Sequence, residues 1–275
     1  MADVRTPGSA PKVELVIVGG GNMGAALLGG LVDSGVFTPD RLAVVELIEA
    51  RRETLRDEFS GVLVTDTIPP CEAAVLAVKP VDIPAAASAA ANAGATRLLS
   101  IAAGVRLATI ESAVADVAAT AVAVIRAMPN TPALVRLGAC AIAGGSTATP
   151  DDTDWAASIL EAVGTVERLS EDALDAFTGV AGSGPAYVFL VAEALTDAAV
   201  TEGLDRDVAE RMVRQLLLGS ATLLDREGDP ARLREMVTSP GGTTAAGLAR
   251  LEAGGLRDVV ADAVRAATER SRELG

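Results

Sequence analysis

The sequence predicts an α/β protein in which an N-terminal Rossmann-type domain with a parallel sheet precedes an all-α C-terminal domain. Within Leu15–Val32 an apolar run breaks into glycines and then resumes at helical spacing. Strand and helix patterns alternate up to about Ser170, and only helical patterns follow from Glu171 onward. We therefore expect a sheet domain over residues 12–170 and a helical domain over residues 171–275.

The first strand-helix pair carries G-x-G-x-x-G at Gly19, Gly21 and Gly24. In dinucleotide-binding folds these glycines allow the tight turn, the approach of a pyrophosphate to the backbone and close packing of helix on strand. The helix N-terminus then holds the phosphates. Any tight strand-helix turn can carry the same glycines. The next predicted strand, Leu42–Glu46, ends in an acid about 20 residues later, where a ribose ligand is expected, so the context favours a dinucleotide site.

The remaining elements follow in order. A charged helix over Arg51–Glu58 and a short strand over Val62–Val64 complete a βαβαβ unit after the helix Met23–Ser34. The proline-bounded run Ala73–Val78 predicts a strand buried on both faces. An eight-strand sheet is completed by a helix over Ile83–Ala91 and by strands over Arg97–Ile101, Ala121–Ala127, Cys140–Ala143 and Thr165–Arg168.

The C-terminal part has helical periodicity and few aromatic residues. Ser183-Gly184-Pro185 precedes its first helix, as is typical of a helix N-terminus. About a hundred residues of such helices form a small domain, so we expect burial against a second copy of the chain. The predicted helices are Ala186–Glu202, Arg206–Arg226, Ala231–Val237, Thr244–Ala253 and Leu256–Glu273.

Composition excludes several classes of function. The formal net charge of −14 argues against nucleic acid or an anionic membrane as the main partner, since both need clustered Lys and Arg. Histidine is absent, which excludes a Ser-His triad, a His-based metal motif and a histidine acid in hydride transfer. Cys71 and Cys140 fit neither a disulfide framework nor a zinc pattern, so we expect buried thiols and no metal. Residues 1–11 lack the pattern of a secretory signal and are expected to be a disordered tail of a soluble, cytoplasmic protein.

Two polar positions follow predicted strands at the sheet edge that lines ligand crevices in open α/β folds. Lys79, one of only two lysines, follows the strand Ala73–Val78 and is the candidate catalytic lysine, although a solvated lysine could equally end a strand. The rigid turn Met128-Pro129-Asn130-Thr131-Pro132 follows another strand. Asn130 and nearby backbone groups could hold the nicotinamide end of a cofactor, or this could be an ordinary Pro-Asn turn.

The loop Ser239-Pro240-Gly241-Gly242-Thr243-Thr244 is a second candidate site. Its glycines expose successive N–H groups ahead of a helix, a geometry that can receive a small carboxylate. Alternatively, Thr243 or Thr244 simply caps the helix.

Five ordered motifs together resemble the pyrroline-5-carboxylate reductase family over nearly the whole chain: G-G-G-N-M-G, A-V-K-P, M-P-N-T-P-A, G-S-G-P-A-Y and M-V-T-S-P-G-G-T-T-A-A-G-L-x-x-L-E. The resemblance implies a Rossmann domain, a helical domain that interlocks with its partner in a homodimer, often assembled into rings, and reduction of 1-pyrroline-5-carboxylate to proline with NADH or NADPH. It implies dinucleotide contacts at Gly19, Gly21, Asn22, Met23 and Gly24, further cofactor contacts at Ala77, Lys79 and Asn130, and substrate contacts at Ser239, Gly242, Thr243 and Thr244.

Two positions depart from the family pattern. Many members have Asn-Arg or Ser-Arg after the second strand, ready for a 2′-phosphate, where this chain has Glu46-Leu47. Val81 stands where Gln is usual after the Lys-Pro pair. A carboxylate at position 46 suits the ribose hydroxyls of NADH, although Arg51 and Arg52 in the next helix could reach back to a phosphate.

The resemblance leads to a mechanism that needs neither histidine nor metal. A hydride from reduced nicotinamide goes to C5 of the cyclic imine, and Thr244, directly or through a water, is the expected proton donor to the ring nitrogen. Two alternatives are a 3-hydroxyacid dehydrogenase and a non-catalytic dinucleotide-binding sensor. The first needs a lysine in the second domain, and no lysine follows Lys79; the second predicts a damaged substrate loop, and residues 239–244 are intact.

Overall fold

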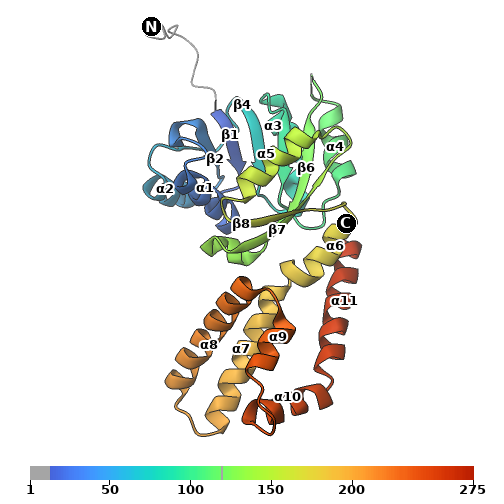
Figure 1. Cartoon of the computed structure of the whole chain (residues 1–275). Coiled ribbons are helices and arrows are strands. Elements are labelled where there is room, and N and C mark those ends of the chain that lie inside the picture. The colour runs from blue at the N-terminus through green and yellow to red at the C-terminus, as the bar shows by residue number, and fades with distance from the viewer. Residues whose placement is uncertain (1–12, 119) are drawn as a thin grey trace. The chain divides into compact units, whose positions relative to one another are not determined.

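The computed structural model describes residues 13–118 and 120–275, so the predicted tail over residues 1–11 lies outside the described residues. The chain forms two compact units (Figure 1). The first runs to Gly182 and also contains the C-terminal segment Ala267–Gly275, and the second is Ser183–Ala266. Each unit is organised around a different kind of packing.

The division by contacts differs from the boundary that the sequence predicts after Ser170. Leu174 is fully buried in the core of the sheet unit. The hydroxyl of Ser271 donates a 2.7 Å hydrogen bond to the carboxylate of Asp175, which holds the end of the last helix in the same unit. These contacts join sequence-distant segments, and a change of periodicity along the chain cannot reveal them.

The first unit contains the predicted eight-stranded sheet, in the order β3-β2-β1-β4-β5-β6-β7-β8. All neighbouring pairs are parallel except β6 and β7, which are antiparallel. The short connection between Met128 and Gly138 explains this difference from the expected parallel sheet, since a parallel return needs a crossover of roughly a dozen residues or more. The strands are β1 (Val13–Val18), β2 (Leu42–Val45), β3 (Leu63–Thr65), β4 (Cys71–Leu76), β5 (Arg97–Ser100), β6 (Ala123–Met128), β7 (Gly138–Gly144) and β8 (Gly164–Arg168).

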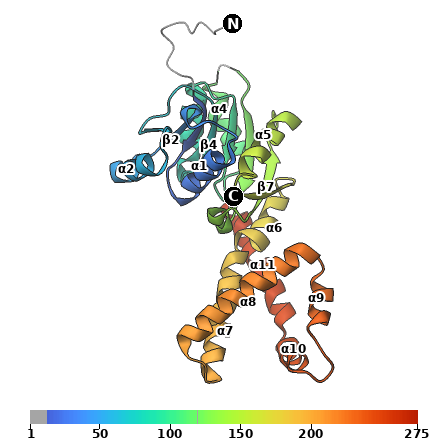
Figure 2. The same cartoon turned by 60° about the vertical axis from the view of Figure 1, so that its left-hand side comes forward.

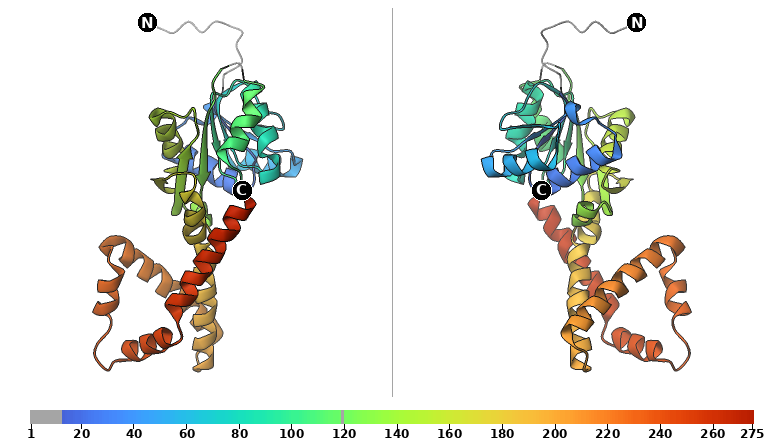
Figure 3. Two further views of the ribbon diagram at one scale, coloured as in Figure 1. Left: turned by 90° about the vertical axis from the view of Figure 1, so that its right-hand side faces the viewer. Right: turned by 90° about the vertical axis from the view of Figure 1, so that its left-hand side faces the viewer.

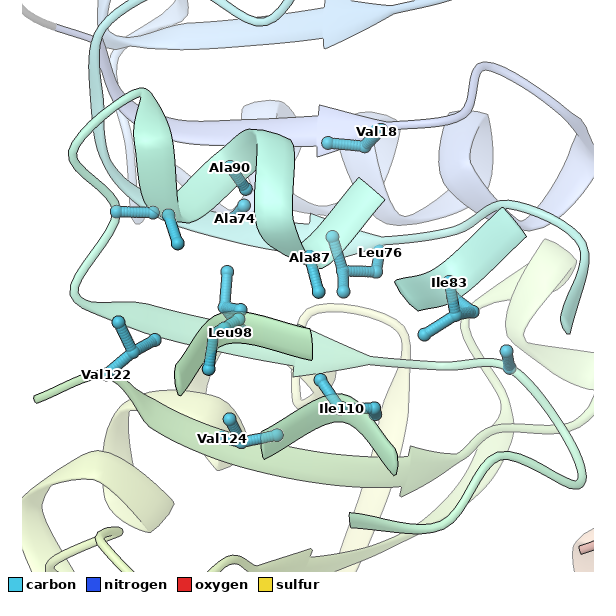
Figure 4. Packing of buried hydrophobic residues seen from close by; sticks show 14 of the residues in the cluster. Val18, Ala74, Leu76, Ile83, Ala87, Ala90, Leu98, Ile110, Val122 and Val124 are labelled. Atoms are coloured by element: carbon cyan, nitrogen blue, oxygen red, sulfur yellow. The ribbon is translucent and has the colours of Figure 1, made fainter. Parts of the chain in front are cut away.

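Helices cover both faces of this sheet (Figure 3). On one face, α3 (Ile83–Asn92), α4 (Leu107–Ala115) and α6 (Ala173–Phe177) pack on the strands. Figure 4 shows side chains of α3 and α4 among those of β4, β5 and β6. On the other face lie α1 (Asn22–Ser34), α2 (Glu49–Glu58) and α5 (Pro150–Leu160). The inner strands are therefore buried on both sides, as their near-continuous apolar runs predict, whereas the edge strands β3 and β8 are not.

The helices α4, α5 and α6 were not among the predicted elements. Helix α5 has a clear local signal, because Thr149 and Asp152 form a capping box around Pro150. Short 3₁₀ turns complete the unit: η1 (Pro39–Arg41), η2 (Pro80–Asp82) and η3 (Thr131–Val135). A π-helical turn, η4 (Thr178–Gly182), follows α6 and ends the first unit before the chain continues into α7.

The second unit is helical, as predicted: α7 (Gly184–Thr201), α8 (Arg206–Glu227), α9 (Pro230–Met236), α10 (Thr243–Ala253) and most of α11 (Leu256–Leu274). Helices α7 and α8 pack against each other (Figure 2). Among its residues only Thr196, Ala209 and Val213 are buried. Large apolar side chains such as Phe189 and Leu190 are more than half exposed.

Candidate active site

The fingerprint turn between β1 and α1 depends on glycine for steric reasons. Gly19 has φ of 112°, in the left-handed region, and a Cβ there would lie 2.4 Å from the carbonyl oxygen of Ala77. A Cβ at Gly24 would lie 2.0 Å from the carbonyl oxygen of Gly19. Backbone atoms cannot yield to such contacts, so both glycines are required by the fold itself.

Gly20 is a third glycine that the turn requires, and the fingerprint pattern does not select it. A Cβ at Gly20 would lie 2.5 Å from Cδ1 of Leu55, which is fully buried on α2. It would also lie 3.1 Å from Cβ of Glu46. Helix α2 and the end of β2 therefore pack directly on this turn.

Gly21 differs from its neighbours because a Cβ there would meet no atom within 4 Å. It is the N-cap of α1, and no side chain among the described residues caps this helix. The first N–H groups of α1 thus face open space at the positive end of a helix dipole, where a phosphate is stabilised. This cradle fits the pyrophosphate of a dinucleotide, and Asn22 and Met23 form its first helical turn.

Glu46 lies where the sequence predicts a ribose ligand, directly after β2. Its Oε2 accepts a hydrogen bond of 3.2 Å from the N–H of Gly20, and its Oε1 accepts one of 2.9 Å from the N–H of Ile48. The two backbone donors hold the carboxylate beside the fingerprint turn, and carboxylate oxygens keep further acceptor capacity for ribose hydroxyls.

The structure separates the roles of the two arginines on α2. Arg52 is buried, and its guanidinium donates to the carbonyl oxygens of Glu46 and Leu47 at 2.6 and 2.9 Å. Arg51 is half-buried, and its Nε donates at 2.8 Å to the carbonyl oxygen of Gly20. Of these two arginines, Arg51 alone lines a crevice of about 890 Å³ beside α1, together with Asn22. Arg52 is therefore committed to the backbone, and Arg51 is the arginine available to a phosphate.

The carboxyl ends of the parallel strands bring the other predicted cofactor residues to one edge of the sheet. Ala77 follows β4, and its N–H donates to the carbonyl oxygen of Val18 at 2.8 Å, which places it beside Gly19. Lys79 is exposed at the start of η2. Its amine has no ion-pair partner in the part of the chain that the structure describes, so its role stays a prediction.

Asn130 follows β6 at the same edge, and its side chain is already engaged. The residue is 8% exposed. Its Oδ1 accepts from the N–H of Ala139 at 2.9 Å, and its Nδ2 donates to the carbonyl oxygen of Ala181 at 3.0 Å. Any contact of this amide with a cofactor remains a prediction, because the structure first gives it a role in holding the turn.

The predicted carboxylate loop lies in the helical unit between α9 and α10. Pro240 and Gly241 occupy the centre of a turn closed by the 3.1 Å hydrogen bond from the N–H of Gly242 to the carbonyl oxygen of Ser239. Gly241 has φ of 71°, which matches the third position of a type II turn. A Cβ at Gly242 would lie 2.4 Å from Oγ of Ser239. The left-handed φ therefore favours glycine at position 241, whereas a Cβ at position 242 would require only the Ser239 hydroxyl to rotate.

The alternative of threonine capping is wrong for this helix. Gly242 is the N-cap of α10, Thr243 is its first helical residue, and no side chain in the described ranges caps it. The N–H groups of the first turn are consequently left for another acceptor. Thr243 is exposed and Thr244 half-buried, so both hydroxyls lie beside a helix N-terminus that can receive a carboxylate.

Two buried polar residues near the edge escaped prediction. Arg126, within β6, is 4% exposed, and its guanidinium lies 3.0 Å from Oε1 of Glu171. The same oxygen accepts from the N–H of Leu107 at 2.7 Å. The signal was an arginine inside an otherwise apolar strand. Ser100, the register partner of Arg126 on β5, has a buried hydroxyl without a hydrogen-bond partner among the described residues.

Cys71 and Cys140 are both buried thiols, as predicted. Burial raises the pKa of the Cys140 thiol to about 11. A thiol held neutral in this way is a poor nucleophile at neutral pH, which supports a structural role for this residue.

The sheet topology, the glycine cradle and the acid after β2 define a dinucleotide-binding oxidoreductase of the Rossmann class. Comparison with known proteins specifies the family. Residues 171–274 match the family model described as pyrroline-5-carboxylate reductase dimerisation, and residues 14–104 match the model described as NADP oxidoreductase coenzyme F420-dependent. The chain belongs to the pyrroline-5-carboxylate reductase family.

Relatives match almost end to end. Pyrroline-5-carboxylate reductase of Synechocystis is 42% identical over 96% of this chain and 99% of its own length. The enzyme of Mycobacterium tuberculosis is 40% identical over 95% of this chain and 96% of its own. Among solved structures, the Coxiella burnetii reductase superposes with a TM-score of 0.88 at 34% identity, covering 96% of this chain and 99% of that one. The Plasmodium falciparum reductase, solved with NADP bound, gives 0.79 at 27% identity, with 97% and 100% covered.

Proposed function

We propose that this protein reduces 1-pyrroline-5-carboxylate to proline with NADH or NADPH, the last step of proline biosynthesis. The observation that carries the proposal is the match to pyrroline-5-carboxylate reductases over 96% of the chain, together with a family-model match that includes the substrate loop. The glycine cradle of the sheet unit and the uncapped helix of the helical unit supply what the two reactants need.

The sheet unit holds the cofactor. The open N-terminus of α1 at Gly21 stabilises the pyrophosphate, and the carboxylate of Glu46 accepts hydrogen bonds from the ribose. Bound reduced nicotinamide supplies the hydride that the reaction needs. The contacts assigned to Ala77 and Lys79 belong to the same proposal.

The helical unit holds the imine. The N–H groups at the start of α10, with Ser239, Gly242 and Thr243, bind the substrate carboxylate. The ring C5 gains the hydride, and the ring nitrogen gains a proton, so one C=N bond becomes a C–N single bond. Thr244 donates that proton, directly or through a water.

The direct test follows cofactor oxidation at 340 nm with and without the imine. Rapid oxidation that requires the imine supports the proposal. Reduction of NAD(P)+ by a 3-hydroxy acid, with no turnover of the imine, would instead favour the dehydrogenase alternative. Cofactor binding without any turnover would favour a sensor.

A hydroxyl series tests the role of Thr244. Thr244→Ala should lower kcat by roughly 10²–10⁴-fold, the usual loss on removing a general acid, with little change in cofactor affinity. Thr244→Ser keeps a hydroxyl and should retain most of the rate. A Thr244→Ala enzyme with nearly full kcat would show that the imine obtains its proton elsewhere.

The assembly is the other part of the proposal. The family match identifies residues 171–274 as a dimerisation region, and the exposed apolar side chains of α7 supply a surface that a second copy covers. By length and composition the helical run Ala173–Thr201 could also cross a membrane. In the proposed dimer, the same apolar residues are buried against the second copy of the chain. Assembly of dimers into rings, and a cytoplasmic location without nucleic-acid partners, remain predictions.

A further inference from the structure

The turn after β6 and the π-helical turn η4 are joined at two points, although they lie about fifty residues apart in the chain. Nδ2 of Asn130 donates to the carbonyl oxygen of Ala181 at 3.0 Å. A Cβ built on Gly182 would lie 2.9 Å from Cε of Met128, so the end of the Met128 side chain rests against Gly182.

The carbonyl of Ala181 needs a donor from outside its helix. In an α-helix this oxygen would accept from the N–H four residues later, which belongs to Pro185. Proline has no N–H. The N–H of Ala186, one residue further, donates instead to the carbonyl oxygen of Ser183 at 3.0 Å. The side chain of Asn130 therefore donates to the Ala181 carbonyl the hydrogen bond that Pro185, which lacks an N–H, cannot donate.

The orientation of the Asn130 amide follows from its partners. The N–H of Ala139 can only donate, so it faces Oδ1, and the carbonyl of Ala181 can only accept, so it faces Nδ2. One nearly buried side chain thus ties three segments together: the end of β6, the start of β7 and η4. A π-helical turn is weaker than an α-helical one and is often found at functional sites.

We propose that Asn130 is a positioning residue for the reduction, acting through the carbonyl of Ala181 rather than by contact with the cofactor. It fixes the last turn of the sheet unit before the chain passes into α7. This role rests on the proposed function, since it links the unit that holds the cofactor to the chain segment leading to the residues that hold the imine. In this chain, Pro185 of G-S-G-P-A-Y leaves the Ala181 carbonyl without an in-helix donor, and Asn130 of M-P-N-T-P supplies one.

The discriminating variant is Asn130→Asp, which keeps the size and the acceptor toward Ala139 and replaces the donor toward Ala181 by an oxygen. We expect kcat for the imine to fall by about 10- to 100-fold, because small displacements of reacting groups cost that much. The Kd of NADH, measured by fluorescence titration without imine, should change less than about threefold. A parallel tenfold loss of NADH affinity would overturn the proposal and make Asn130 a direct cofactor ligand.

Pro185→Ala tests the route through Ala181, because alanine restores an N–H at position 185. In the Pro185→Ala background, Asn130→Asp should cost less than about threefold in kcat. The reference protein for this comparison is the single Pro185→Ala variant. A loss of tenfold or more in that background would show that Asn130 does not act through the Ala181 carbonyl.

A matched control separates positioning from simple loss of stability. Ser88 on α3 donates at 2.6 Å to the carbonyl oxygen of Ala113 on α4, away from the turn. Ser88→Ala should lower Tm by a few degrees, as Asn130→Asp does, and leave kcat unchanged. The double-mutant cycle of Asn130→Asp and Pro185→Ala can also be measured as changes in Tm, and this measurement reports on the Asn130–Ala181 hydrogen bond without any substrate. A wild type that does not reduce the imine would therefore contradict the proposed function while leaving this hydrogen bond testable.

Discussion

The two units of this protein have similar apolar patterns and opposite degrees of burial. In the sheet unit, apolar side chains from β1, β2, β4, β5, β6 and β7 and from six helices fill two clusters, one on each face. In the helical unit only Thr196, Ala209 and Val213 are buried, whereas Val188, Phe189, Leu190 and Val191 are each about half exposed or more.

The difference shows which unit is complete in a single chain. A parallel sheet covered on both faces supplies every apolar side chain with neighbours. A small layer of helices cannot do so, and burial of each large apolar side chain is worth about 1.5–3 kcal/mol. The same kind of residue is therefore an internal core element in one unit and an assembly surface in the other. The following experiments test this contrast, from the largest expected effect to the smallest.

The largest effect is expected from Leu190→Asp, at a site 65% exposed in the single chain. If a second copy covers this face, each dimer gains two buried carboxylates, at a cost of several kcal/mol each. Sedimentation velocity should show loss of the dimer, and imine reduction should fall with it. Val36→Asp, at a similarly exposed position of the sheet unit, is the control and should leave both unchanged. A Leu190→Asp protein that remains dimeric would contradict the assignment of this face.

The sheet unit should respond to the fingerprint glycines in two different ways. Gly24→Ala places a methyl group against the backbone of Gly19 and should cost about 3 kcal/mol of unfolding free energy. Gly21→Ala enters open space, so stability should be retained while NADH affinity falls at least about tenfold, through obstruction of the pyrophosphate. Urea unfolding and cofactor titration measure both. Equal stability of the two variants would contradict the packing described for Gly24.

The Cys140 thiol predicts how stability depends on alkaline pH. Its pKa is about 11 in the folded protein, against 9.0 for the free group, because burial disfavours the thiolate. The unfolded chain therefore ionises first, and this contribution is intact below pH 9 and is lost as the pH rises toward 11. Between these values wild type should lose up to about 3 kcal/mol more than Cys140→Ala. Parallel pH profiles of the two proteins would show that the thiol ionises equally in both states.

Cofactor choice should give the smallest effect, and it sharpens the roles of Glu46 and Arg51. Because Glu46 is held beside the ribose position and would repel a 2′-phosphate, NADH should be used at least as well as NADPH. Arg51 limits the discrimination, and Arg52 contributes nothing since it is committed to the backbone. The measurement compares kcat/KM for both cofactors in wild type and in the Glu46→Ser, Leu47→Arg double variant.

A tenfold preference of wild type for NADPH, about 1.4 kcal/mol, would show that Arg51 outweighs the carboxylate. In that case Arg51→Ala should remove the preference for NADPH. Arg52→Ala should leave the ratio of kcat/KM for the two cofactors unchanged.

Local patterns determined the strands of the sheet and the helices of the second unit, since alternation and helical periodicity are properties of short segments. The apolar run before Gly19 and the left-handed backbone at Gly19 are examples, because backbone sterics act between near neighbours. The order of motifs likewise determined the family. Helices α4 and α6 were missed because they are short, with 9 and 5 residues, and only contact with the sheet makes such short helices stable.

Tertiary structure alone decided the remaining features. Glycine is needed at position 20 because Leu55 on α2 packs against it. Arg52 is bound to carbonyl oxygens just after β2. The amide of Asn130 is bound to the Ala181 carbonyl, which Pro185 leaves without a donor. The antiparallel β7 follows from a connection too short for a crossover. These features depend on which distant groups meet, and a hydrogen bond or steric contact between them leaves no periodic trace in the sequence.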